Sequence, residues 1–218
     1  MTGKNSSTSG LKNLGAMRYS EFRKYWFATL ASVIGFQMFM FSQLWLVRQL
    51  EENPIWLGAL GLATGIPAIV LNLFGGVVAD RFDRKRVIMS TQILSGLLIF
   101  TLAILTFLEM VLVWHVLLIA FLNGAVRAFN QPAHQALFPH LIERSALMNA
   151  VALTSSIWQS TRVMAPAFAG GIISIFDTEV SLFVSSLAFL VGFTIMALVN
   201  APSLPKAERK GAIHDLLL

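Results

Sequence analysis

Long runs without any charged residue constrain this chain more than any other feature. Asp, Glu, Lys and Arg are all absent from residues 25–47, 53–79, 87–108 and 180–205. A helix needs about 20 mostly apolar residues to cross the hydrocarbon core of a bilayer, and each run is long enough. The runs therefore predict helices that cross a lipid bilayer, near residues 26–48, 55–79, 87–109 and 180–200.

Two weaker apolar stretches complete the pattern. Residues 110–126 carry no charge apart from His115, and residues 146–175 are interrupted by a single charge, Arg162. Both are long enough to span, so the sequence predicts an all-α membrane protein with six transmembrane helices. The segments around them divide the chain into a leader (1–24), a six-helix bundle (25–200) and a start of a linker (201–218).

The composition excludes several classes of protein. Of 218 residues, 56% are hydrophobic and only 12% are charged, whereas soluble domains carry about 25% charged residues. A soluble enzyme and a disordered chain are therefore excluded. The chain has no Cys, which excludes disulfides and thiolate metal sites. No catalytic or nucleotide-binding motif is present, and His134 and His140 lack a third metal ligand. We expect no enzymatic activity, no metal and no cofactor.

The basic residues indicate the orientation in the membrane. Cytoplasmic loops carry an excess of Lys and Arg. Fourteen of the 16 basic residues lie on one side of the predicted spans: Lys4, Lys12, Arg18, Arg23, Lys24, Arg81, Arg84, Lys85, Arg86, Arg127, Arg144, Lys206, Arg209 and Lys210. We therefore expect a multi-pass protein of the inner or plasma membrane with both termini in the cytoplasm. The same distribution explains the basic pI, so nucleic acid is not an expected partner.

The connection after the second predicted span carries the strongest motif. It reads Gly76-x-x-x-Asp80-Arg81-x-Asp83-Arg84-Lys85. This resembles the signature loop of the major facilitator superfamily, G-x-x-x-D-R-x-G-R-[KR], with Asp83 in place of the second glycine. The resemblance implies a cytoplasmic gating motif at Gly76, Asp80, Arg81, Arg84 and Lys85. Arg127 joins it as a hypothetical partner of Asp80, because both are expected at cytoplasmic helix ends.

A second resemblance runs through the fourth and fifth spans. Residues 132–142, then Asn149-Ala150, Gln159, Arg162, Pro166 and Gly170-Gly171, are similar to the branch of this superfamily that holds the enterobactin exporter and macrolide-efflux proteins. The resemblance implies the N-terminal six-helix bundle of the fold, built from two inverted three-helix repeats. It also implies secondary export of a small siderophore- or drug-like molecule by alternating access. Six spans are half of this family's twelve, so we expect a missing C-terminal half.

Several residues are candidates for the site. Charges inside spans are costly and usually face a cavity or a partner, so Arg162 either binds substrate or pairs with another helix. Gln37, Gln159 and Asn123 are further cavity candidates, with helix-to-helix hydrogen bonding as the alternative. Pro166 followed by Gly170 and Gly171 predicts a bend in the fifth helix.

The predicted spans contain no carboxylate. Proton-coupled transporters often use an acidic residue inside the membrane, so the coupling ion stays open. A different class of function also stays open, namely a membrane scaffold or half-transporter subunit that binds a partner through its bundle face.

Overall fold

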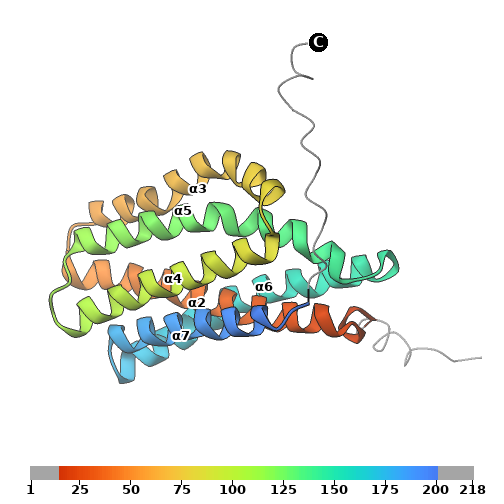
Figure 1. The fold of residues 1–218 in the computed structure, drawn as a ribbon. Helices are drawn as coiled ribbons and strands as arrows, with labels where there is room; N and C mark the ends of the chain where they lie inside the picture. Colours follow the sequence, from red (N-terminus) through yellow and green to blue (C-terminus); the bar gives the residue numbers. More distant parts are fainter. Residues whose placement is uncertain (1–14, 201–218) are drawn as a thin grey trace, which may run out of the picture.

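The computed structural model describes residues 15–200, with side chains described for all of these except residues 73–81. The regular secondary structure within that range is entirely helical, with short connecting segments between the helices. The six long ones are α2 (Ser20–Leu50), α3 (Ile55–Arg81), α4 (Arg84–Phe107), α5 (Val113–Leu137), α6 (Leu147–Ile175) and α7 (Thr178–Ala197). Three short 3-10 helices lie at one end of the bundle: η1 (Gly15–Arg18), η2 (Phe138–Leu141) and η3 (Arg144–Ala146). The long helices run alongside one another (Figure 1).

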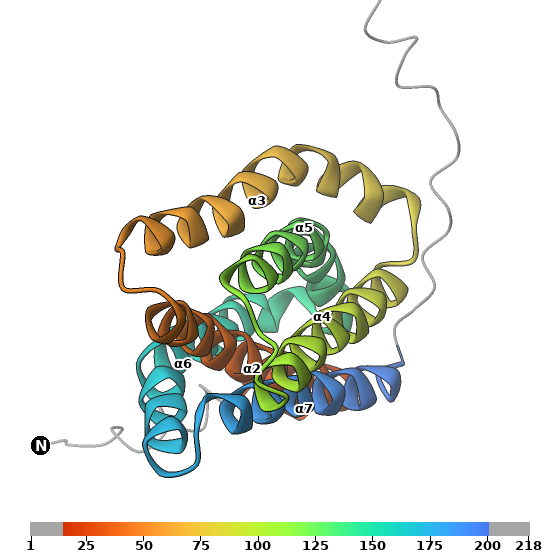
Figure 2. The same cartoon turned by 90° about the vertical axis from the view of Figure 1, so that its left-hand side faces the viewer.

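The packing order of the helices is symmetric. The extensive contacts join α3 to α5, α5 to α4, α4 to α7, α7 to α2 and α2 to α6. Exchanging the first three helices with the last three, in sequence order, gives the same set of pairs. The described bundle is therefore built from two three-helix repeats, α2–α4 and α5–α7, as predicted. In this row of contacts α3 and α6 are the two ends, with α3 packed on α5 and α6 on α2 (Figure 2).

In two of these helix pairs, α3 with α5 and α2 with α7, the backbones approach closely at a glycine. A Cβ atom on Gly124 of α5 would lie 2.6 Å from the carbonyl oxygen of Thr64 in α3. A Cβ atom on Gly35 of α2 would lie 2.7 Å from the carbonyl oxygen of Ser185 in α7. Only glycine lets the backbones approach this closely, which is how helices pack tightly inside a membrane.

Five helices have the length and apolar composition needed to cross a membrane. They are α2, α3, α4, α5 and α7, the last two with spans at Val113–Leu141 and Thr178–Ala197. The sixth long helix, α6, has 29 residues but falls outside this set because Ser, Thr, Gln and Arg side chains interrupt its apolar sequence. It packs against α2 as part of the same bundle.

The structure corrects the end of one predicted span and the start of another. The fourth span was predicted to end at residue 126, before Arg127, but α5 continues to Leu137. The helix continues because Arg127 turns toward a polar interior cavity and stacks on a ring there. The first helix begins at Ser20, inside the predicted leader, and Phe22 in its first turn is already fully buried in the bundle. The predicted linker, residues 201–218, lies outside the described residues.

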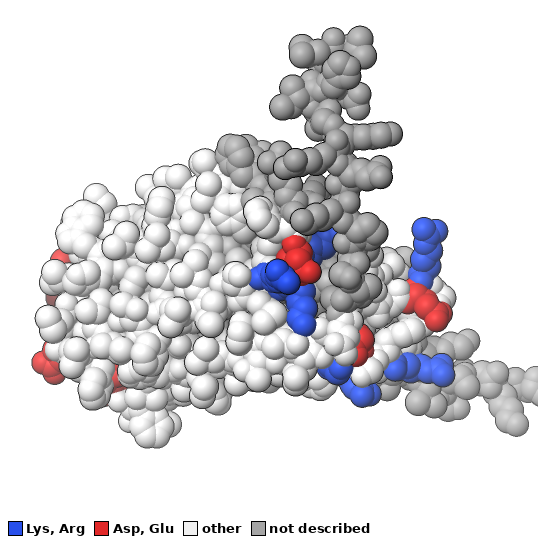
Figure 3. Space-filling view, viewed as in Figure 1, with Lys and Arg blue, Asp and Glu red and all other residues white. Residues whose placement is uncertain are grey.

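Charges separate toward the two ends of the bundle. In the space-filling view, the visible Lys and Arg side chains gather at the end where the two described termini lie, and the opposite end shows only acidic ones (Figure 3). Lysines at the basic end bind helix C-termini: Lys85 Nζ donates to the carbonyl of Ala197 at 2.9 Å and Lys24 Nζ to that of Leu198 at 3.2 Å. Cations are favoured there because carbonyl groups at the end of a helix lack partners within it.

Candidate functional site

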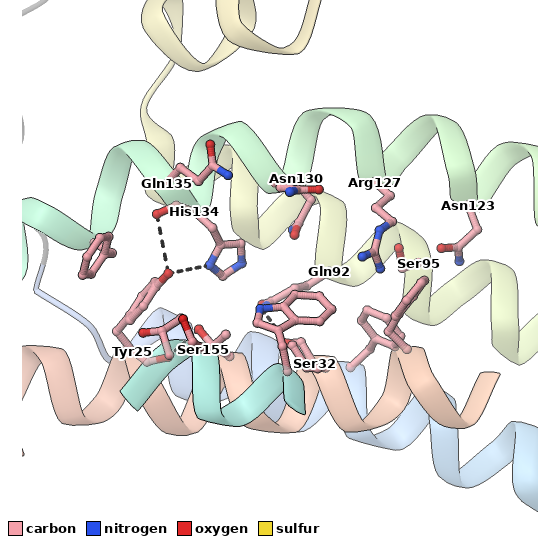
Figure 4. Close-up of a pocket in the computed structure, with 18 of the residues that line it drawn as sticks. Tyr25, Ser32, Gln92, Ser95, Asn123, Arg127, Asn130, His134, Gln135 and Ser155 are labelled. Atoms are coloured by element: carbon pink, nitrogen blue, oxygen red, sulfur yellow. Dashed lines mark hydrogen bonds between the residues drawn. The ribbon is translucent and has the colours of Figure 1, made fainter. Parts of the chain in front are cut away.

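A cavity of about 350 Å³ lies between α2 and α5, inside the bundle. Residues of α4 and α6 complete its walls, and Phe189 of α7 closes one part. Its volume falls in the lower part of the range for small-molecule sites. Polar side chains from facing helices point into it, as Figure 4 shows for Tyr25, Ser32, Gln92, Asn123, Arg127, Asn130 and His134.

Two polar stripes with the same spacing line this cavity. On α5 the stripe is Asn123, Arg127, Asn130 and His134, and on α2 it is Tyr25, Thr29 and Ser32, followed by Phe36. In both, successive members lie four, three and four residues apart. That spacing places them on one face of a helix. The helices α2 and α5 are each the first helix of a repeat. Two opposite walls of the cavity are therefore formed by equivalent helices of the two repeats.

Arg127 is the one cation that lines the cavity among the described residues. Its guanidinium carbon lies 3.6 Å above the ring centroid of Phe36 and 5.3 Å from that of Trp158. Arginine at the centre of a spanning helix costs about 3 kcal/mol on insertion scales, and a desolvated cation–π contact returns about 2 kcal/mol. No carboxylate from the described side chains lies within ion-pair distance of Arg127. The charge therefore sits against aromatic rings with its N–H donors toward the cavity.

Three buried polar atoms of the cavity walls have no hydrogen-bond partner among the residues that the structure describes. They are Nδ2 of Asn123, Oε1 of Gln92 and Oγ1 of Thr154. Asn123 is 3% exposed and Gln92 only 1%. Buried polar groups in proteins are nearly always satisfied, so unpaired donors and acceptors around one cavity indicate a place for water or a polar ligand. The amide nitrogen of Gln92 does have a partner, Ser32 Oγ at 2.7 Å.

A tyrosine–histidine pair closes the basic end of the cavity. The Tyr25 hydroxyl lies 2.9 Å from Nδ1 of His134 and is almost wholly buried (Figure 4). Tyr25 and His134 come from α2 and α5, so this hydrogen bond joins the two repeats. The phenol O–H donates when Nδ1 of the imidazole is unprotonated, and the pair then satisfies the buried hydroxyl and the half-buried imidazole.

The structure places the four predicted cavity residues in different environments. Asn123 lies in the cavity wall. Gln37 is half-buried in α2, and Gln159 and Arg162 lie on the exposed side of α6. These last three do not line the cavity. Their assignment to substrate binding stays a prediction.

The predicted bend in the fifth helix also has a definite place. Pro166 lies inside α6, which continues as a helix to Ile175. A Cβ atom on Gly170 would lie 3.6 Å from the Phe41 ring, an ordinary contact, and one on Gly171 would meet nothing within 4 Å. Neither position requires glycine for packing within the bundle, and a role in bending stays a prediction.

The signature loop divides into two parts. The side chains of Gly76, Asp80 and Arg81 lie outside the described residues. Arg84 is described, and its Nη1 donates to the carbonyl of Ala136 near the end of α5 at 3.1 Å. Lys85 binds the end of α7 as given above. These two residues of the motif therefore connect α4 to the ends of both neighbouring helices.

Asp83 occupies the position where the signature has glycine, and its role is visible. It is the N-cap of α4, and its carboxylate accepts the backbone N–H of Arg86 at 3.0 Å. Its φ of −61° is open to any residue, so the turn does not need glycine. Aspartate is among the preferred N-cap residues.

Arg127 does not lie at a cytoplasmic helix end, and that part of the prediction is wrong. It lies well inside α5 and contacts Phe36 of α2. The error came from treating the first charge after an apolar run as the end of the span. The signal that would have found it is the polar stripe of α5, since Asn123, Arg127 and His134 recur at helical spacing on both sides of the predicted end.

The fold and the cavity together define a class of protein. This is a multi-pass, all-helical membrane protein with repeat-related helices around a polar cavity at mid-bundle, the architecture of secondary transporters.

The comparison with known families places the chain within that class. The sequence model of the transmembrane secretion effector family matches residues 11–213, and the chain belongs to this family of the major facilitator superfamily. It is similar to the staphyloferrin A transporter of Staphylococcus aureus, with 26% identity over 67% of this chain and 37% of that protein. It is also similar to macrolide efflux protein A of Streptococcus pyogenes, with 22% identity over 84% of this chain and 45% of that protein. The chain thus spans less than half the length of these curated relatives.

Proposed function

We propose that this chain is the N-terminal half of a secondary transporter that exports small organic molecules by alternating access. Two relatives support transport of a small organic molecule, since one is named a staphyloferrin A transporter and the other a macrolide efflux protein. The second name supports export. The observation that carries the proposal is the polar cavity between α2 and α5, with Arg127 in its wall. A scaffold protein has no need of unpaired buried donors and acceptors around a central cavity.

The exposed side of α6 supports a second half. Ser155, Ser156, Gln159, Ser160 and Arg162 are all exposed on this helix. Polar and charged side chains of a spanning helix almost always face protein or a water-filled space rather than lipid. We therefore propose that α6, with α3 at the other end of the row, faces a C-terminal six-helix bundle. The greater length of the relatives agrees with this.

The charge distribution supports the orientation. The end with Lys24, Arg84 and Lys85 is the cytoplasmic one by the positive-inside rule. Both termini then lie in the cytoplasm of a cell whose plasma or inner membrane holds the protein. The signature loop lies on the same side, where it acts as a latch between the halves.

An efflux assay tests the proposal. The complete gene product is reconstituted into vesicles loaded with a ferric siderophore or with a radiolabelled macrolide, and loss of the compound is followed with and without a pH gradient. Export predicts loss above that of protein-free vesicles for at least one of the two compounds. Loss equal to that of protein-free vesicles in both arms and under both conditions contradicts export of these classes and favours a non-transporting scaffold.

Two variants test whether Arg127 and Arg162 take part in transport. Arg127→Gln removes the cavity charge, and we expect transport to fall by about tenfold or more if the guanidinium binds substrate. Arg162→Ala tests the residue on the exposed side of α6. Unchanged transport in Arg162→Ala would remove that residue from the mechanism.

A further inference from the structure

The guanidinium of Arg127 lacks a counter-ion in the part of the chain that the structure describes. Phe36 covers one of its faces at 3.6 Å, and Trp158 lies at 5.3 Å. These contacts are with aromatic rings, so the N–H donors of the guanidinium stay unused within the described residues. Five such donors in a rigid plane fit a carboxylate, which accepts two of them side by side.

A second donor lies next to it on the same helix. Asn123 precedes Arg127 by one helical turn, lines the same cavity and is 3% exposed. Its Nδ2 has no partner. A neutral amide donor one helical turn from a cation, on the same face of the helix, favours an anionic ligand, because charge-assisted hydrogen bonds are the stronger ones.

The remaining walls match a ligand with an apolar, flat part. The rings of Phe36, Trp158 and Phe189 line the cavity beside Arg127. On α4, the Oε1 atom of Gln92 is a buried acceptor without a partner. The cavity volume of about 350 Å³ fits a small organic molecule or part of a larger one.

We propose that this cavity binds organic carboxylates, with Arg127 and Asn123 holding the carboxylate and the aromatic rings holding an adjacent flat group. The inference rests on the proposed function and deepens it by naming the chemical class of the substrate. Binding of a carboxylate in this cavity does not depend on which ion gradient drives transport.

An equilibrium binding experiment tests this without transport. The complete protein is purified in detergent and titrated with 1-naphthoate, while the quenching of tryptophan emission is followed. The neutral analogue 1-naphthamide, which has the same rings, is titrated in parallel. Trp158→Phe identifies the part of the signal that comes from the cavity. We expect naphthoate to bind at least tenfold more tightly than naphthamide.

Variants assign the binding to the two donors. Arg127→Gln is expected to weaken naphthoate binding about ten- to a hundredfold and to leave naphthamide binding unchanged. Arg127→Lys keeps the charge and is expected to retain part of the preference. Asn123→Leu is expected to weaken naphthoate binding severalfold. Arg48→Gln is the matched control, because Arg48 lies near the end of α2 and donates to the carbonyl of Glu52.

Three results would overturn the inference. The first is equal binding of naphthoate and naphthamide, and the second is a naphthoate affinity that neither Arg127→Gln nor Asn123→Leu changes. The third is no naphthoate binding to the wild-type protein up to the solubility limit, as expected if a carboxylate from the rest of the protein pairs with Arg127. Because binding is measured at equilibrium, a protein that binds naphthoate but exports nothing would refute export alone.

Discussion

At the scale of single residues, the Tyr25–His134 hydrogen bond joins the two repeats at the basic end of the cavity. Tyr25→Phe removes the donor and leaves a buried imidazole nitrogen without a partner. An unsatisfied buried acceptor costs about 1–3 kcal/mol. We expect a matching loss of stability, measured as a lower midpoint of thermal unfolding in detergent.

A second variant separates this explanation from lost packing. In Tyr25→Phe with His134→Leu both polar groups are replaced, so no buried group is left unpaired and most of the stability is expected to return. If the double variant is less stable than Tyr25→Phe alone, the hydrogen bond does not explain the effect.

Residue-level reasoning from the sequence located part of the site. Asn123 was predicted as a cavity residue, with helix-to-helix hydrogen bonding as the alternative, and it lines the cavity, but its contact with substrate stays a prediction. Arg127 was assigned to a loop, since a charge after an apolar run resembles the end of a span. Only the contact with Phe36, which comes from another helix, shows why the charge is tolerated, and sequence spacing alone does not reveal that contact.

At the scale of helices, Asp83 explains how α4 can begin without the second glycine of the signature loop. Asp83→Ala removes the N-cap of α4, which costs about 1 kcal/mol. Asp83→Gly is expected to cost only a few tenths of a kcal/mol, and Asp83→Asn to cost little. The measurement is the unfolding midpoint of the three variants. Equal loss in Asp83→Ala and Asp83→Asn would contradict a capping role.

Close packing of α3 on α5 gives a second prediction for helices. Gly124→Ala places a methyl group 2.6 Å from the Thr64 carbonyl oxygen, and such overpacking costs about 1–3 kcal/mol. Gly61→Ala in α3 is the matched control, because a Cβ atom there meets nothing within 4 Å. Thermal unfolding is expected to shift down for Gly124→Ala only. Gly→Ala by itself raises helix propensity, so a midpoint that stays the same or rises in Gly124→Ala, as in Gly61→Ala, would contradict the packing explanation.

At the scale of the whole molecule, the fold followed from the sequence more completely than the site did. Charge-free runs predicted α2, α3, α4 and α7, because a membrane requires about 20 apolar residues in each span. The division into two three-helix repeats was implied by a resemblance and not by composition, and the packing order α3–α5–α4–α7–α2–α6 was not predicted. The polar side of α6 (Ser155 to Arg162) made that helix the least typical span, and it is also the side that the proposed second half covers.

Alternating access of the cavity is the central claim, and thiol labelling tests it most directly. The chain has no Cys, so Ser155→Cys places a single thiol in this segment at the cavity wall. Any cysteine in the remaining length of the protein is removed first. Thr101→Cys, on the exposed side of α4, is the control in a lipid-facing position.

The measurement is labelling by a membrane-impermeant thiol reagent added to either side of sealed vesicles. We predict that Ser155→Cys reacts from both sides and is protected by 1-naphthoate, while Thr101→Cys reacts from neither. Reaction of Ser155→Cys from one side only, under every condition that supports transport, would contradict alternating access.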